Sequence, residues 1–142
     1  MAVMTDDEWR AFLTEPARTG KLATVRADGR PHVAPLWFIL DGDDSVVFTT
    51  GATTAKGRSL RANPQVALCV DDDRPPFSFV ILEGMVEISE DPDQLLLWAT
   101  RLGGRYMGAE RADQYGRRNA VPGELLVRLR PAKVVAHKNI AD

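Results

Sequence analysis

The segment VVFTTGATTAKGRSLRANP, residues 46–64, decides the expected fold. It reads as a short apolar strand, a turn of small residues and a basic, helix-compatible segment that a proline ends. A helix beginning near Thr54 would gather free backbone N–H groups, the positive end of the helix dipole, Lys56, Arg58 and Arg61 near one end. That combination favours binding of a phosphate. A solvated basic face on an ordinary surface helix explains the same residues equally well.

The composition is that of an ordinary globular chain. Its 142 residues, 44% hydrophobic and 27% charged, are enough to bury a real core, and we expect one domain over residues 1–142. The net charge of -2 and the pI of about 5.7 argue against a general nucleic-acid binder, which would be strongly basic. The basic residues are therefore a local feature.

Cysteine usage and the N-terminal residues favour a cytoplasmic protein. Cys69 is the single cysteine, so no disulfide framework and no thiolate metal cluster is expected. The opening MAVMTDDEWRAFL is acidic where a signal peptide would be basic. No apolar run approaches the roughly 18 residues that a membrane span needs. We expect neither a membrane nor a nucleic acid as partner.

Hydrophobic periodicity predicts a mainly β, α+β chain: a small, mostly antiparallel barrel with peripheral helices. Asp28-Gly29 is a strong hairpin signal, and the three strands before the basic helix look like a meander. Strand 31–40 is apolar on both alternating faces, so we expect both to be covered. Thr5 and Glu8 make a capping-box pattern that predicts the first helix. After it we expect strands at 21–26, 31–40 and 45–50, the basic helix, strands at 65–70 and 77–89, a helix at 92–102 and a final strand at 124–137.

Proline and glycine positions add three finer expectations, and an arginine-rich segment adds a fourth. Pro35 within a strand implies a sheet edge or a bulge, and Gly84 marks a bulge or a close backbone approach. Gly103-Gly104 is expected to end the preceding helix. Residues 105–123 are mixed and arginine-rich, which we interpret as a lid.

The sequence lacks the common motifs of metal sites, hydrolases and nucleotide-binding enzymes. His32 and His137 lie far apart with no HExxH or CxxC around them, so no metal site is predicted. The chain also lacks a GxSxG elbow, a P-loop and a GxGxxG fingerprint, which leaves hydrolase and NTPase functions without support. A basic anion cradle beside aromatic strands suits a phosphorylated aromatic ligand, and such a cofactor would carry the chemistry.

Three segments carry a resemblance that covers nearly the whole chain: GKLATVRADGRPHVAPLWFILDGD, VVFTTGATTAKGRSLRANPQVALCVDDD and FSFVILEGMVEI. Together they resemble the pyridoxamine 5′-phosphate oxidase-like flavoproteins, which have an FMN-binding-like split β-barrel. Within that family the chain is most similar to the actinobacterial flavin/deazaflavin oxidoreductases, which use coenzyme F420 in place of FMN. Members of that branch often keep an A-K-x-R-x-L-R-x-x-P stretch, which here spans residues 55–64.

The resemblance implies a homodimer of split barrels, each with six or seven strands, and cofactor sites at the subunit interface. Lys56 and Arg61 would bind the cofactor phosphate, and residues 49–51 would meet it through hydroxyl or backbone groups. Residues 35–37 would line the ring, although an aromatic such as Trp37 in an apolar strand is more often core. The full set of implied cofactor-binding residues is Pro35, Leu36, Trp37, Thr49, Thr50, Gly51, Thr54, Ala55, Lys56, Arg58 and Arg61.

The activity implied is hydride transfer from reduced F420 to an electron-poor small molecule such as a quinone, a tetrapyrrole or an unsaturated carbonyl compound. An FMN-dependent oxidase-like enzyme and a non-catalytic flavin- or haem-binding protein are the alternatives. No residue stands out as catalytic. Tyr106, Tyr115 and His32 are candidates for proton delivery, with a structural role as the alternative for each. The arginines of 101–118 would serve the acidic tail of F420 if they lie at the groove.

Overall fold

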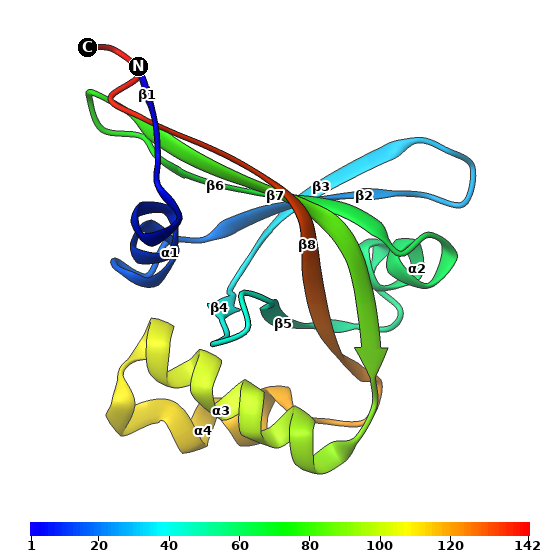
Figure 1. Ribbon diagram of the computed structural model, residues 1–142. Coiled ribbons are helices and arrows are strands. Elements are labelled where there is room, and N and C mark those ends of the chain that lie inside the picture. Colours follow the sequence, from blue (N-terminus) through cyan, green and yellow to red (C-terminus); the bar gives the residue numbers. More distant parts are fainter.

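A curled antiparallel sheet with helices around it forms the framework of the computed structural model, which describes all 142 residues (Figure 1). The predicted split β-barrel class is confirmed: seven strands form one continuous path, and a short eighth strand pairs with β8. The strands are β1 (Ala2–Val3), β2 (Gly20–Val25), β3 (Pro31–Leu36), β4 (Ile39–Leu40), β5 (Val46–Gly51), β6 (Gln65–Asp72), β7 (Ser78–Ser89) and β8 (Glu124–Lys138).

Four α-helices surround the sheet, and local signals in the sequence explain where most of them begin. Thr5 and Glu8 form the capping box expected before the first helix, and Asp91 caps the third through the backbone N–H of Asp93. None of these helices has the length and apolar character to cross a bilayer. The helices are α1 (Asp6–Thr14), α2 (Ala55–Ala62), α3 (Pro92–Met107) and α4 (Ala112–Asn119), and a 3-10 turn, Ala109–Arg111, joins the last two.

The strand order is β3-β2-β6-β7-β8-β5-β4, so the predicted meander is right in its two local pairings, β2 with β3 and β4 with β5, and wrong in treating residues 31–40 as one strand. The strand expected at 31–40 is divided into β3 and β4, which lie at opposite ends of this order and are joined by Trp37 and Phe38 alone. The physical reason is Phe38, whose fully buried side chain turns the chain into the core between the two strands. The sheet is thus closed there by the covalent chain and not by hydrogen bonds between β3 and β4.

The core fills the concave side of the sheet. Phe38 and Phe48 are its largest fully buried side chains, and α1 contributes Trp9 and Leu13. The β2–β3 hairpin extends away from the body (Figure 1), and Val33 on it is 66% exposed. The expectation that both faces of this strand are covered is therefore wrong within one chain, because β3 is an edge strand that leaves the barrel.

Two finer expectations about strands are confirmed. Pro35 lies on the edge strand β3, where its missing N–H costs no ladder hydrogen bond. The register between β7 and β8 shifts between Glu83 and Gly84, and a Cβ at position 84 would collide with the backbone of Arg130. Gly84 therefore permits the close approach of two strands at a bulge.

The expected helix end at Gly103-Gly104 is wrong, since α3 continues to Met107. A Cβ on Gly103 would lie 2.5 Å from Cβ of Tyr115, and one on Gly104 would lie 3.3 Å from Cβ of Ala112. The glycines therefore allow α4 to pack closely on α3. As a result, α3 and α4 form a helical hairpin over residues 92–119, and residues 105–119 are its connection and second helix in place of the mixed segment that we expected.

Candidate functional site

The turn from β5 into α2 is held by threonine hydroxyls. Thr54 is the N-cap of α2: its Oγ1 accepts a hydrogen bond from the N–H of Gly57 at 3.1 Å and donates one to the carbonyl of Gly51 at 2.8 Å. The hydroxyl of Thr50 lies 3.3 Å from that of Thr54. Both hydroxyls are therefore used to shape the turn.

Gly57 brings the first turn of α2 against the end of β5. A Cβ at position 57 would collide with the carbonyl oxygen of Gly51 and lie 3.0 Å from Cα of Ala52. The N–H groups of Ala55 and Lys56, in the first turn of the helix, make no hydrogen bond to another part of the protein. These N–H groups and the helix dipole are available to an anion.

A cavity of about 180 Å³ lies beside this turn. Trp37 is the aromatic residue of its lining and Lys56 is the basic residue. Lys56 forms no ion pair. The structure thus brings together five of the predicted cofactor-binding residues, which come from β3, β5, α2 and the link after β3. The lining residues are Pro35, Leu36, Trp37, Thr49, Lys56, Ala99, Leu102 and Asn119.

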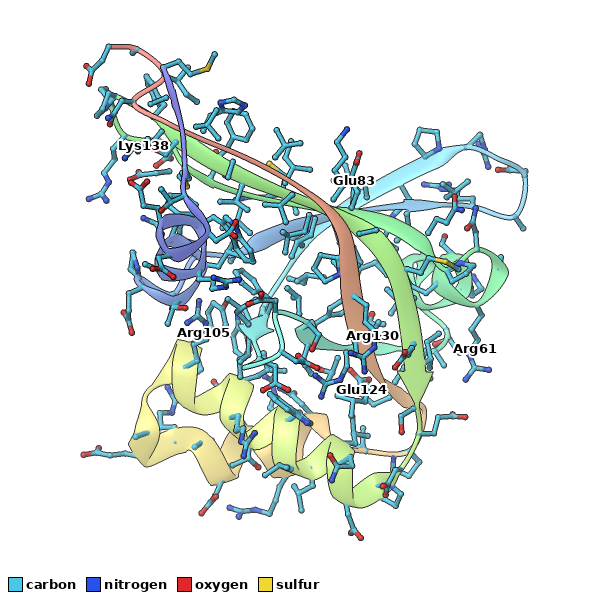
Figure 2. All side chains as sticks on the ribbon, viewed as in Figure 1. Arg61, Glu83, Arg105, Glu124, Arg130 and Lys138 are labelled. Carbon is cyan, nitrogen blue, oxygen red and sulfur yellow. The ribbon has the colours of Figure 1, made fainter.

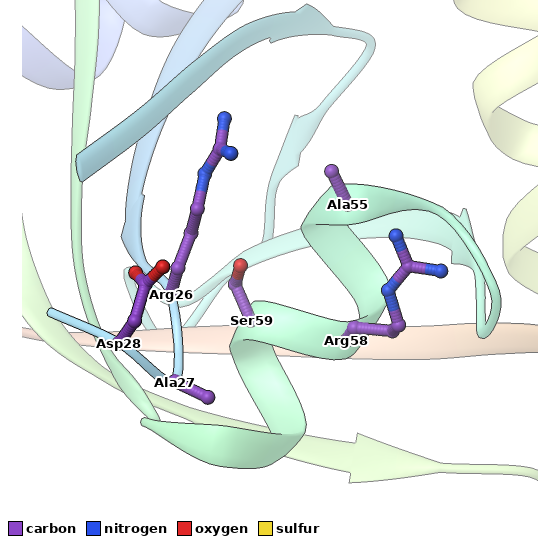
Figure 3. Close-up of a pocket in the computed structure, with 6 residues that line it drawn as sticks. All are labelled: Arg26, Ala27, Asp28, Ala55, Arg58 and Ser59. Atoms are coloured by element: carbon purple, nitrogen blue, oxygen red, sulfur yellow. The ribbon is translucent and has the colours of Figure 1, made fainter. Parts of the chain in front are cut away.

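A second cavity, of about 300 Å³, lies on another side of α2 (Figure 3). Arg26, Ala27 and Asp28 of the β2–β3 hairpin line one side, and Ala55, Arg58 and Ser59 of α2 line the other. Spacings of three and four residues place the α2 members on one helical face. Arg26 and Arg58 each bring a basic side chain to this lining, and Asp28 brings a carboxylate that pairs with Arg30.

Neither guanidinium at the second cavity is neutralised. Arg58 donates a hydrogen bond to the carbonyl of Thr53 at 3.0 Å, and no acidic side chain lies within ion-pair distance of it or of Arg26. The Nε atom of Arg26 is buried without a hydrogen-bond partner. Lys56, Arg58 and Arg26 are thus three cations around the first turns of α2 that form no ion pair with an acidic side chain. Their N–H groups are donors that suit a phosphate or a carboxylate ligand.

Arg61 lies outside both cavities. It forms an ion pair with Glu90 at 3.4 Å and projects from the far end of α2 (Figure 2). Glu124, the first residue of β8, pairs in register with Gly51. Burial raises the pKa of the Glu124 carboxyl, and the nearby charge of Lys56 acts in the opposite direction. The Glu124 carboxyl therefore lies within electrostatic reach of the cation at the aromatic cavity.

The three candidates for proton delivery have different surroundings. The Tyr106 hydroxyl lies 2.7 Å from the carbonyl of Arg18 and is enclosed by backbone groups. Tyr115 accepts a hydrogen bond from Arg111 at 3.2 Å. His32 lies on the edge strand β3, and its Nδ1 is buried without a partner. None of the three lines either cavity.

Four of the five arginines of 101–118, all but Arg117, pack on aromatic rings or backbone. Arg101 lies 4.7 Å from the ring centre of Trp98, and Arg118 lies 5.4 Å from that of Tyr115. Arg105 donates hydrogen bonds to the carbonyls of Leu13 and Thr14, which ties α3 to the end of α1. None of these arginines lines either cavity.

Several lining residues were not anticipated from the sequence. Ala99 and Leu102 come from α3 and Asn119 from α4, and no local signal connects them with β3 or β5. At the second cavity, the spacing of Ser59 after Ala55 and Arg58 was a usable signal, because it places the three on one helical face. Arg26 had no comparable signal.

Comparison with known proteins agrees with the fold. A family model described as pyridoxamine 5′-phosphate oxidase matches residues 5–138. The chain belongs to the pyridoxamine 5′-phosphate oxidase family. A pyridoxine/pyridoxamine 5′-phosphate oxidase from Cupriavidus metallidurans is 36% identical over 114 residues, which are 77% of this chain and 50% of that protein. The chain thus spans about half the length of the curated relatives it matches.

Two solved structures extend the comparison to the fold of this family member. The conserved hypothetical protein Rv2991 from Mycobacterium tuberculosis superimposes with a TM-score of 0.84 at 26% identity, covering 96% of this chain and 86% of that one. A structure named F420 reductase has a TM-score of 0.67 at 33% identity, covering 87% of this chain and 93% of that one. The chain is therefore similar in both sequence and structure to proteins of an oxidoreductase, flavin-type family.

Proposed function

We propose that this protein is an F420-dependent reductase that transfers a hydride from the reduced deazaflavin to an electron-poor small molecule: a quinone, a tetrapyrrole or an unsaturated carbonyl compound. The observation that carries this proposal is the set of three cations without acidic partners around α2, beside an aromatic cavity. The similarity to the protein named F420 reductase, at 33% identity over 87% of this chain, supports it.

Lys56 and the free N–H groups of Ala55 and Lys56 would hold the cofactor phosphate, because a point charge and a helix N-terminus both favour an anion. Trp37 and Pro35 would line the ring. The bound deazaflavin supplies the hydride. The chain would contribute position, exclusion of water and positive charge to stabilise the electron density that develops on the acceptor.

The second cavity favours F420 over FMN. The deazaflavin carries a phosphodiester-lactate-polyglutamate tail, whereas FMN ends in a single phosphate. Arg26 and Arg58 would give that acidic tail two guanidinium groups next to the turn that holds the phosphate. An FMN-dependent oxidase is the second candidate function, and the similarity to the Cupriavidus oxidase favours it.

We propose that the working unit is a homodimer with cofactor sites between subunits. The aromatic cavity of about 180 Å³ is smaller than typical ligand sites of roughly 300 to 1,000 Å³. Val33 is 66% and Met85 54% exposed, and a second copy would cover such exposed apolar side chains. Size-exclusion chromatography with light scattering should give twice the 15.7 kDa chain mass. A monodisperse monomer would count against interfacial sites.

The deciding experiment is a parallel titration of the apoprotein with F420 and with FMN, monitored by tryptophan fluorescence at low and high salt. Tight binding of F420 that weakens with salt, together with weak binding of FMN, is the expected result. Reduced F420 should then be oxidised in the presence of a quinone. Tighter binding of FMN would favour the FMN-dependent oxidase. If neither cofactor binds, both candidate functions are rejected.

A further inference from the structure

Tyr106 lies at the one place where the two ends of the sheet are joined by the chain alone. β3 and β4 are at opposite ends of the strand order, and only Trp37 and Phe38 connect them. The backbone of this link is outside the β3 and β4 ladders. Its orientation must therefore be fixed by contacts other than sheet pairing.

The Tyr106 hydroxyl provides those contacts. Its oxygen accepts a hydrogen bond from the N–H of Phe38 at 3.1 Å and lies 2.7 Å from the carbonyl of Arg18 and 3.2 Å from that of Phe38. Its single proton is donated to one carbonyl at a time, and the Arg18 carbonyl is the nearer. One side chain of α3 thus holds the link and the segment before β2 together.

The ring of Tyr106 fixes the other half of the link. It stacks on Trp37 with ring centres 5.1 Å apart and planes 3° apart, while Tyr115 packs on the indole in a T-shaped arrangement with ring centres 6.0 Å apart. Tyr106 therefore covers one face of the indole, which leaves its other surfaces to line the aromatic cavity with Lys56. Parallel stacking constrains the plane of the indole as well as its position.

We propose that Tyr106 is the positioning residue of the cofactor site: through its hydroxyl and its ring it sets the plane of Trp37 against which the cofactor ring is placed. The inference rests on the proposed function for the identity of the ring. The role is one of preorganisation, because an indole held in place before binding loses no freedom when the ring arrives.

The test has a part that needs no cofactor. Labelling with 5-fluorotryptophan gives three ¹⁹F signals, since the chain has three tryptophans, and Trp37→Phe identifies one of them. Tyr106→Phe, which keeps the ring and removes the hydroxyl, should shift or broaden the Trp37 signal and leave those of Trp9 and Trp98 in place. Tyr115→Phe is the matched control, because its hydroxyl contacts only Arg111 at the surface.

The second part measures affinity. Tyr106→Phe should weaken F420 binding about fivefold, the usual effect of one hydrogen bond, and Tyr106→Leu should weaken it further through loss of the stack. An unchanged Trp37 signal in Tyr106→Phe would overturn the inference, and so would a F420 affinity equal to that of the Tyr115→Phe control. If the wild-type protein binds neither F420 nor FMN, the proposed function fails, and the ¹⁹F comparison alone decides whether Tyr106 positions Trp37.

Discussion

The charge of Lys56 acts on the carboxyl of Glu124 across the turn between β5 and α2. Burial raises the pKa of that carboxyl, and the ammonium group opposes the rise. The influence is mutual: an ionised Glu124 weakens the positive potential that Lys56 presents to the aromatic cavity, and a protonated Glu124 leaves it intact. Anion binding at this turn therefore depends on a residue that does not line the cavity with Lys56.

Lys56→Ala should weaken F420 binding about tenfold, because it removes a charge-assisted contact to the phosphate. The free energy of unfolding should change by no more than about 0.5 kcal/mol, since Lys56 forms no ion pair in the folded protein. Fluorescence titration and urea unfolding measure the two quantities. Lys133→Ala, at a lysine paired with Glu83, is the control and should leave affinity unchanged. Equal affinity of the Lys56 variant and the wild type would remove Lys56 from the phosphate site.

Glu124→Gln should tighten F420 binding at pH 8 about threefold, because the neutral amide no longer offsets the charge of Lys56. In the wild type, affinity should fall as pH rises through the raised pKa of Glu124, and the variant should lack this dependence. Because the pKa is raised, the folded protein binds the proton of the Glu124 carboxyl more tightly than the unfolded chain does. The stability that this protonated carboxyl contributes therefore declines as pH rises above about 4.5. Glu110→Gln, at an exposed residue of the 3-10 turn, is the control. A pH profile shared by both variants and the wild type would contradict the coupling.

Gly57→Ala should destabilise the protein by about 1–3 kcal/mol, although alanine normally favours a helix by about 1 kcal/mol over glycine. The reversal is expected because the new methyl group would collide with the carbonyl of Gly51 and push α2 from β5. Urea unfolding measures the change, and F420 affinity should fall with it. Gly42→Ala is the control, since nothing lies within 4 Å of its added carbon. A stabilised Gly57→Ala protein would show that the first turn of α2 tolerates displacement.

Acid stability should depend on Asp43. Hydrogen bonds from the side chain and backbone of Ser45, with a further contribution from Arg130, lower the pKa of this carboxyl from 3.8 to about 2. A lowered folded-state pKa gives stability that is present above pH 3.8 and is lost as pH falls toward 2. Asp43→Asn should flatten the decline in stability over this interval, whereas Asp73→Asn should not. Circular dichroism melts at several acidic pH values would reveal the difference, and parallel curves for wild type and Asp43→Asn would refute it.

Local signals were sufficient for much of the fold. The Asp28-Gly29 hairpin, the capping box at Thr5 and the turn into α2 each depend on neighbouring residues, and each is where it was expected. The same kind of signal was misleading at Gly103-Gly104, because a glycine pair either ends a helix or lets a second helix approach it. Only the position of Tyr115 in space distinguishes these outcomes.

Features that depend on residues far apart in the sequence could not be predicted from local sequence patterns. The break at Trp37 and Phe38 depends on β3 and β4 belonging to opposite ends of the sheet, which no local pattern encodes. The association of Trp37 with Lys56 was expected only through family resemblance, and both residues do line one cavity. Arg26 was overlooked because its role depends on how the β2–β3 hairpin lies against α2.

The position of β8 in the sheet has a consequence for synthesis on the ribosome. This strand pairs with both β7 and β5, so without it the ladder β3-β2-β6-β7 and the pair β5-β4 are not hydrogen-bonded to each other. In a nascent chain that has not yet released residues 124–138, these two pieces of sheet therefore share no ladder hydrogen bonds and have open edges. Completion of the barrel is then a late event, and the growing chain depends on protection of those edges until its last long strand emerges.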